Sequence, residues 1–221
     1  MLPGIGMARV VSDAASGIQA IQEAADPSAV VQAFASASAV APNDSQVLNA
    51  YVSRMVDLGL PEIAYHQAQA LATMEPENGL PWAVVAYVDA RRNDMADAAT
   101  AIEKAARYSP DNAFVDRAAG GIVAWSETDG GKAGLSSSDL EKVADVKSIL
   151  NKRSEFTTAY NAAREGYAGP NQPGAAEGPS APPEAQVQPG TVAPAYPAYP
   201  DYSYSYPDYS YSYPDYGTTV I

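Results

Sequence analysis

The chain has 221 residues, and its 26 Asp and Glu outnumber its 13 Lys and Arg, giving a formal net charge of −13 at pH 7. This charge opposes binding to phosphate backbones, so we expect no nucleic acid partner. The absence of cysteine from the sequence excludes disulfides, thiolate metal ligands and cysteine nucleophiles. The sequence lacks the long apolar run of a membrane span, and residues 1–7 lack the basic start and apolar core of a secretory signal. We therefore expect a cytoplasmic protein.

The composition changes near residue 169. Residues 170–221 hold 11 of the 18 prolines and nine of the 15 tyrosines, and they contain no Lys or Arg. A segment of this kind cannot bury enough apolar surface to fold. The sequence therefore predicts a short N-terminal extension over residues 1–10, a folded body, a Pro-rich linker over 169–199 and a disordered tail over 200–221.

Prolines recur in the body with a period of 34 residues. Pro42, Pro76 and Pro110 each stand 34 residues from the next, and Pro27 and Pro61 repeat this interval in a second register. Pro27 follows an aspartate that can cap a helix, so it marks a helix start. Pro42, Pro76 and Pro110 end helices, and the Asn and Asp residues after them favour a turn and cap the next helix.

Between these prolines the apolar residues have helical spacing. Leu48, Tyr51, Val52 and Met55 follow an i, i+3, i+4, i+7 pattern in the second unit. Each unit is therefore predicted to be an antiparallel pair of helices. The fold class expected is all-α, with units over residues 11–44, 45–78 and 79–112.

The 34-residue period, the closing prolines and the spacing of Trp82 and Ala86 resemble the tetratricopeptide repeat (TPR). This resemblance covers residues 11–112, about half of the chain, and none of the tail. It implies an α-solenoid of tandem helix pairs. The third unit departs from the pattern at Asp89, where the family usually has an aromatic residue.

Residues 113–168 are predicted to shield the apolar end of such an array. A fourth helix is expected over residues 113–126, with Gly120 in a slot for small residues that lets a neighbouring helix approach closely. The glycine-rich stretch 128–134 is expected to be a loop.

Beyond this stretch, the pattern from Ser138 to Glu141 is typical of a capping box at a helix start. The apolar face that follows runs to about Gly166 and predicts either one long helix or two helices broken near Asn151. We expect this region to be a cap rather than a binding surface.

The resemblance also implies a site, because in this family the first helix of each pair lines a concave groove that binds peptides. The equivalent positions here combine hydrogen-bonding, charged and aromatic side chains, with Tyr87 or Trp125 as the anchor and core packing as the alternative for Trp125. The implied groove residues are Asn49, Ser53, Asp57, Tyr87, Arg91, Arg117 and Trp125. The family's clamp for acidic C-termini is not expected, since none of its four equivalent positions is basic. The lone His66 and the lack of a phosphate-binding loop predict a protein with no catalytic site, metal or cofactor.

The tail has a period of its own. The heptapeptide Pro-Asp-Tyr-Ser-Tyr-Ser-Tyr starts at Pro200 and again at Pro207. Tyrosine gives a large contact area at low entropic cost, so this segment is a candidate for partner docking, self-association, adhesion or modification. The candidate residues are Tyr202, Tyr204, Tyr206, Tyr209, Tyr211 and Tyr213.

Two functions are therefore predicted. In the first, the chain is a non-catalytic scaffold that binds a peptide segment of a protein partner in its groove. The alternative places the function in the Tyr-rich tail, with the body as a folded anchor. A related hypothesis is that the tail occupies the chain's own groove, which the linker is long enough to permit.

Overall fold

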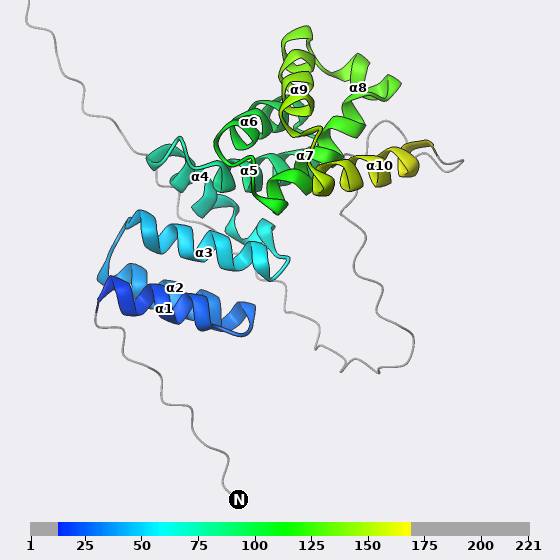
Figure 1. Ribbon diagram of the computed structural model, residues 1–221. Coiled ribbons are helices and arrows are strands. Elements are labelled where there is room, and N and C mark those ends of the chain that lie inside the picture. The colour runs from blue at the N-terminus through cyan, green and yellow to red at the C-terminus, as the bar shows by residue number, and fades with distance from the viewer. Residues whose placement is uncertain (1–12, 169–221) are drawn as a thin grey trace, which may run out of the picture. The chain divides into compact units, whose positions relative to one another are not determined.

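The computed structural model describes residues 13–168, which form only helices and no β-strand (Figure 1). The all-α expectation is confirmed for this range. The N-terminal extension, the linker and the Tyr-rich tail lie outside the described residues, so the tail hypotheses stay predictions. The helices are α1 (Ala14–Glu23), α2 (Pro27–Val40), α3 (Ser45–Asp57), the 3₁₀ helix η1 (Pro61–Ala64), α4 (Tyr65–Met74), α5 (Gly79–Arg91), α6 (Met95–Tyr108), α7 (Ala113–Ser126), α8 (Asp129–Gly134), α9 (Ser137–Leu150) and α10 (Ser154–Ala168).

The helix starts follow from local capping chemistry. Helix α2 begins at Pro27, and the Asp26 carboxylate accepts a hydrogen bond from the first turn of the helix. Asp44, Asn78 and Asn112 cap α3, α5 and α7 in the same way. Each of these three residues follows one of the closing prolines by two positions, so the same short phrase ends one helix and starts the next.

Helices α3 and α5 end with the same backbone motif. Gly59 and Asn93, which are 34 residues apart, both have positive φ values, of 73° and 66°. In both turns the amide of the next residue donates a hydrogen bond of 2.9 Å to a carbonyl five residues earlier. This is the Schellman arrangement, and it reverses the chain so that the following helix packs back.

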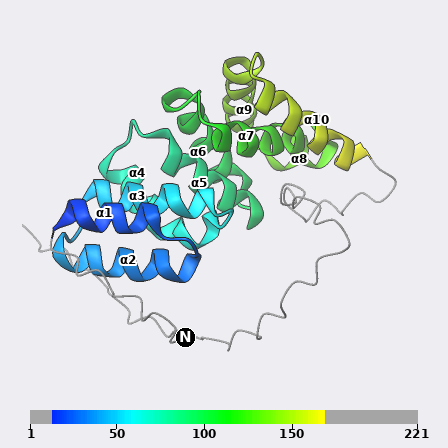
Figure 2. The ribbon, with the colours of Figure 1, turned by 60° about the horizontal axis from the view of Figure 1, so that its bottom comes forward.

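The first helices of the expected pairs lie next to one another. Helix α1 contacts α3, α3 contacts α5, and α5 contacts α7, while α2, α4 and α6 each pack on their own first helix (Figures 1 and 2). Val52, Ala86 and Gly120 occupy equivalent positions in this row, and all three are buried. The row of first helices is the element that positions the candidate site.

The expected loop over residues 128–134 is wrong, because Asp129–Gly134 folds into α8. The Thr128 hydroxyl caps this helix by accepting a hydrogen bond of 3.0 Å from the Gly131 amide. A side chain at Gly131 would overlap the Trp125 carbonyl of α7. The glycine therefore serves close packing of α8 on α7.

The expected capping box at Ser138 is also wrong by two residues. Ser136 is the N-cap of α9, and its hydroxyl accepts a hydrogen bond of 3.2 Å from the Asp139 amide. The chain then breaks after α9 at Asn151, as one of the two alternatives predicted. Helix α9 packs on α6 and α7, and α10 packs along α7.

Candidate functional site

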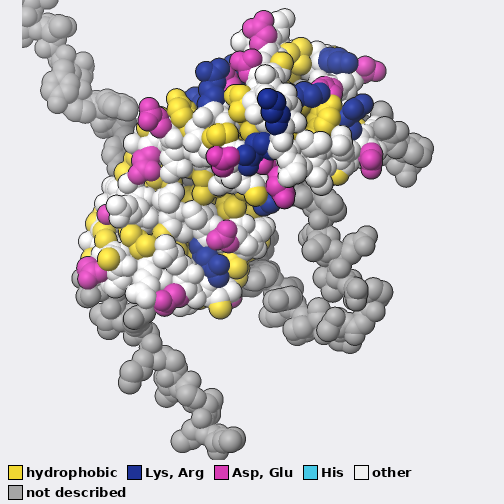
Figure 3. Space-filling view, in the orientation of Figure 1, with side chains coloured by type: hydrophobic (Ala, Val, Ile, Leu, Met, Phe, Trp, Pro, Cys, Tyr) yellow, Lys and Arg dark blue, Asp and Glu magenta, His cyan; other side chains and the backbone are white. Residues whose placement is uncertain are grey.

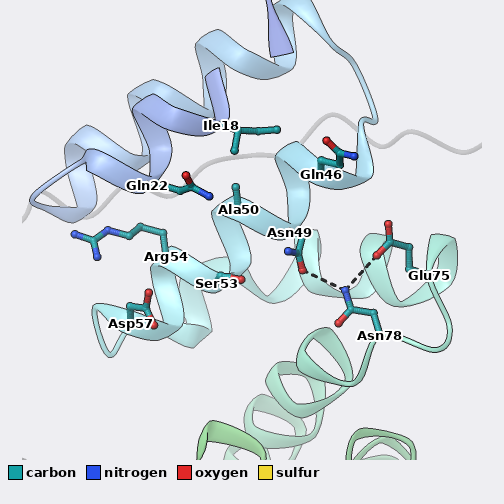
Figure 4. Close-up of a pocket in the computed structure, with 10 residues that line it drawn as sticks. All are labelled: Ile18, Gln22, Gln46, Asn49, Ala50, Ser53, Arg54, Asp57, Glu75 and Asn78. Atoms are coloured by element: carbon teal, nitrogen blue, oxygen red, sulfur yellow. Dashed lines mark hydrogen bonds between the residues drawn. The ribbon is translucent and has the colours of Figure 1, made fainter. Parts of the chain in front are cut away.

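An open groove of about 440 Å³ lies between α1, α3 and the turn that joins α4 to α5 (Figure 4). We refer to it as the α1–α3 groove. Three of the predicted groove residues, Asn49, Ser53 and Asp57, line it from successive turns of α3. The complete lining is Ile18, Gln22, Gln46, Asn49, Ala50, Ser53, Arg54, Asp57, Glu75 and Asn78.

One wall of the groove is held by a small hydrogen-bond network. The Asn78 side-chain amide donates to the Asn49 side-chain oxygen at 3.1 Å and to a Glu75 carboxylate oxygen at 3.1 Å. The Asn78 side-chain oxygen accepts from the Leu80 amide at 3.3 Å, which is its capping bond at the start of α5. Both ends of the Asn78 amide are therefore engaged, and its bond orients Asn49.

Arg54 joins the other two walls. Its Nε and Nη2 atoms donate to the Ala24 backbone carbonyl at 3.0 and 2.7 Å. This carbonyl belongs to the residue that caps the C-terminus of α1. The guanidinium thus fixes α1 against α3, which gives it a positioning role.

Four other polar side chains of the α1–α3 groove are not held by hydrogen bonds of this kind. The side chains of Gln22, Gln46, Ser53 and Asp57 make no hydrogen bond or ion pair with another described residue. Ser53 is half-buried and the other three are exposed. The two carboxamides can each donate and accept, and the hydroxyl can do both, so this surface can bind groups that carry both functions.

Asp57 has an unusual position. It is the last residue of α3, at the end where the helix dipole is negative and an anion is disfavoured. Figure 4 shows Asp57, Ser53, Asn49 and Glu75 following one another along the groove. A carboxylate without a partner in residues 13–168 therefore lies at one end of this row of hydrogen-bonding groups.

Tyr87 and Arg91 lie together on α5 but do not line the α1–α3 groove. The Arg91 Nε lies 3.3 Å from a Glu62 carboxylate oxygen, and its Nη1 lies 3.4 Å from the Tyr87 hydroxyl. The Tyr87 ring packs on Phe114 of α7, with ring centroids 5.7 Å apart. Burial raises the pKa of Tyr87, and the charge of Glu62 adds to this rise while Arg91 opposes it. Both predicted residues are thus already engaged with neighbours.

The structure separates the last two predicted residues from the others. Arg117 is exposed on α7. Trp125 is only 8% exposed and borders a different hollow, of about 340 Å³, between the start of α6 and α8. The expected anchoring role of Trp125 in an open groove is therefore corrected, since α8 packs over this end of α7. The alternative of core packing describes it better.

The sequence reasoning missed Gln22, Arg54, Glu75 and Asn78. Asn78 was expected only as a helix cap. Its place at the start of a first helix could have indicated its contact with Asn49 of the neighbouring first helix. Gln22 and Arg54 carried no signal, because their roles depend on where α1 lies against α3.

Comparison with family models gives no match, and comparisons with curated proteins and with solved structures give no match either. Over residues 13–168, no three His, Asp or Glu side chains gather in a way that could hold a metal ion. None of the helices in the same range has both the length and the apolar character required to cross a membrane. The function is therefore argued from the α1–α3 groove itself.

Proposed function

We propose that this protein is a non-catalytic scaffold that binds an extended peptide segment of a protein partner in the α1–α3 groove. The observation that carries the proposal is the set of unengaged polar side chains, Gln22, Gln46, Ser53 and Asp57, along one groove. An extended peptide exposes amide donors and carbonyl acceptors along its length. Carboxamide and hydroxyl groups can form hydrogen bonds with both the donors and the acceptors of the peptide backbone, whatever its side chains are.

The fixed walls of the groove support the same proposal. Because Arg54 joins α3 to the end of α1 and Asn78 orients Asn49, binding does not have to order these elements. A site that is formed before the ligand arrives loses less entropy on binding. The groove is also open to solvent, which suits a polypeptide better than an enclosed small molecule.

A TPR-like solenoid is part of the proposal. It is supported by the 34-residue proline period, by the matching turns at Gly59 and Asn93, and by the contacts between successive first helices. Peptide binding on the row of first helices is the use that such an arrangement implies. The localisation we propose remains the cytoplasm.

Peptide display against the full chain, followed by a groove-blocking substitution, tests this function. Ser53→Tyr places a ring in the middle of the groove, and Ser148→Tyr adds the same ring at an exposed position of α9. We expect selected peptides to bind the wild-type chain and Ser148→Tyr equally and to lose at least about tenfold in affinity for Ser53→Tyr. Circular dichroism of both variants checks that they fold. Selection of no peptide, or equal binding to the two variants, overturns the proposal.

A further inference from the structure

The charge of the body is divided unevenly between its two halves. Residues 13–90 contain nine Asp and Glu and one Arg, a net charge of −8, whereas residues 91–168 contain 12 acidic and 11 basic residues, a net charge of −1. Figure 3 shows the Lys and Arg side chains gathered mainly over the C-terminal helices on the face in view. The α1–α3 groove belongs to the acidic half.

The groove itself offers anions for which the described residues supply no matching cation. Asp57 has no described partner, and Glu75 accepts only the hydrogen bond from Asn78. Arg54 is the one base that lines the groove, and its guanidinium is directed to the Ala24 carbonyl. The next equivalent position of the repeat differs, because Arg91 is paired there with Glu62.

We infer that the α1–α3 groove selects an extended peptide segment that carries Lys or Arg, with Asp57 binding the basic side chain and the amides of the groove binding the main chain. This inference rests on the proposed function and adds the ligand's charge. An ammonium or guanidinium group would supply the cation that Asp57 lacks at the negative end of the α3 dipole. Charge complementarity of this kind contributes to selectivity and to the rate of association.

The inference also decides between occupants. Residues 169–221 contain five Asp and Glu and no Lys or Arg, so this segment has the same sign of charge as the groove. Like charges placed together oppose binding. The occupant is therefore a basic segment of another protein and not the chain's own tail.

Three peptide pools of the same length measure the selectivity. They carry Lys, Gln or Glu at the same alternating positions and are otherwise identical, and their binding to the full chain is followed by fluorescence anisotropy. We expect the Lys pool to bind at least about tenfold more tightly than the Gln pool at low salt, with this ratio reduced at about 0.5 M salt because exposed charges are screened. The Glu pool should bind most weakly. Binding of the Lys pool should be lost in Ser53→Tyr, which assigns it to the groove.

Isosteric variants assign the selectivity to particular carboxylates. Asp57→Asn should bring the affinity for the Lys pool close to that for the Gln pool, and Glu75→Gln should have a smaller effect, since Glu75 already accepts one hydrogen bond. The matched controls are Asp129→Asn and Glu141→Gln, which remove the same charges at exposed positions of α8 and α9. Both controls should change affinity by less than about twofold, because their charges are distant from the groove and screened.

Each outcome bears on one of the two claims. If the pools bind equally, if the Glu pool binds best, or if Asp57→Asn and Asp129→Asn act alike, the charge inference is wrong, while groove binding that Ser53→Tyr abolishes still supports the proposed function. If no pool binds, the proposed function fails together with the inference. A synthetic peptide of residues 200–221 should not displace a bound Lys peptide, and displacement would overturn the exclusion of the tail.

Discussion

Gly120 lies where α10 packs most closely on α7. A Cβ at this position would stand 2.7 Å from the Ala159 Cβ and 2.7 Å from the Tyr160 backbone nitrogen. Carbon atoms in folded proteins do not approach to this distance. Gly120→Ala must therefore displace the backbone of α10, which cannot move aside as a flexible side chain can.

Two contributions of opposite sign set the size of the effect. Alanine in a helix interior is favoured over glycine by about 1 kcal/mol. Overpacking costs about 1–3 kcal/mol, and the cost lies near the upper end here because the contacted atoms belong to backbone. Displacement of α10 also loosens Phe156 and Tyr160, which are only 2% and 8% exposed. We expect Gly120→Ala to lower the free energy of unfolding by about 2 kcal/mol in total.

Gly166→Ala is the matched control, because Gly166 lies in α10 and a Cβ there would meet nothing within 4 Å. This control should raise the free energy of unfolding by up to about 1 kcal/mol. Urea unfolding of the full chain, followed by far-UV circular dichroism, measures both effects. A melting experiment should show Gly120→Ala lower by about 4–8 °C. If Gly120→Ala is as stable as the wild type while Gly166→Ala gains stability, α10 does not lie at this distance from α7.

Three further substitutions test a buried hydrogen bond, a turn and an ion pair. Tyr65→Phe removes the hydrogen bond of 2.7 Å to the buried Asp89 carboxylate, which should lower the free energy of unfolding by about 1–3 kcal/mol in urea titrations. Gly59→Ala places a side chain at a φ of 73° and should cost about 1 kcal/mol in the same assay; an unchanged value would contradict the turn geometry. Arg153→Met removes two hydrogen bonds of 2.8 Å to Asp116. Burial raises the pKa of Asp116, and Arg153 opposes this rise. The folded variant should then hold its Asp116 proton to higher pH, so its stability deficit, measured as the urea midpoint, should be larger at pH 7.5 than at pH 5. Equal deficits at the two pH values would refute this assignment.

The helical fold could be predicted because its signals are local. Proline position, a following Asn or Asp, and helical apolar spacing act within a few residues, so they mark α2, α3, α5 and α7 without knowledge of the packing. Helix α8 was not predicted, because it depends on packing and not on local signals. Adjacent glycines in residues 129–134 indicate a loop by propensity, but close packing of Gly131 on the α7 backbone favours a helix. Tertiary contact here overrides local preference.

The residues of the site that the repeat places could be predicted, and the others could not. Asn49, Ser53 and Asp57 share one face of one helix, so the 34-residue register places them together. The same register assigns Trp125 to the groove, but it contains no information about the packing of α8 over the end of α7. Arg54 was missed because its partner is a backbone carbonyl 30 residues earlier.

Asp57, Arg91 and Trp125 occupy equivalent positions near the ends of three successive first helices, yet their surroundings differ completely. Asp57 is exposed and has no partner among the described residues, Arg91 is paired with Glu62, and Trp125 is buried. The turns after Asp57 and Arg91 have the same backbone geometry, so the side chains and their neighbours make this difference.

Two ion pairs join α7 to the helices that follow it. Arg153 with Asp116 and Lys147 with Glu127 are described ion pairs that join α7 to the helices following it. Such pairs fix the packing of α9 and α10. The α1–α3 groove differs, because Arg54 and Asn78 hold its walls while the side chains of Gln22, Gln46, Ser53 and Asp57 have no partner among the described residues. Substitutions in the two regions should therefore affect different properties. Arg153→Met should lower stability with little effect on peptide affinity, and Asp57→Asn should lower affinity without loss of stability. A variant series in which the two quantities change together would show that the groove and the C-terminal helices are not independent.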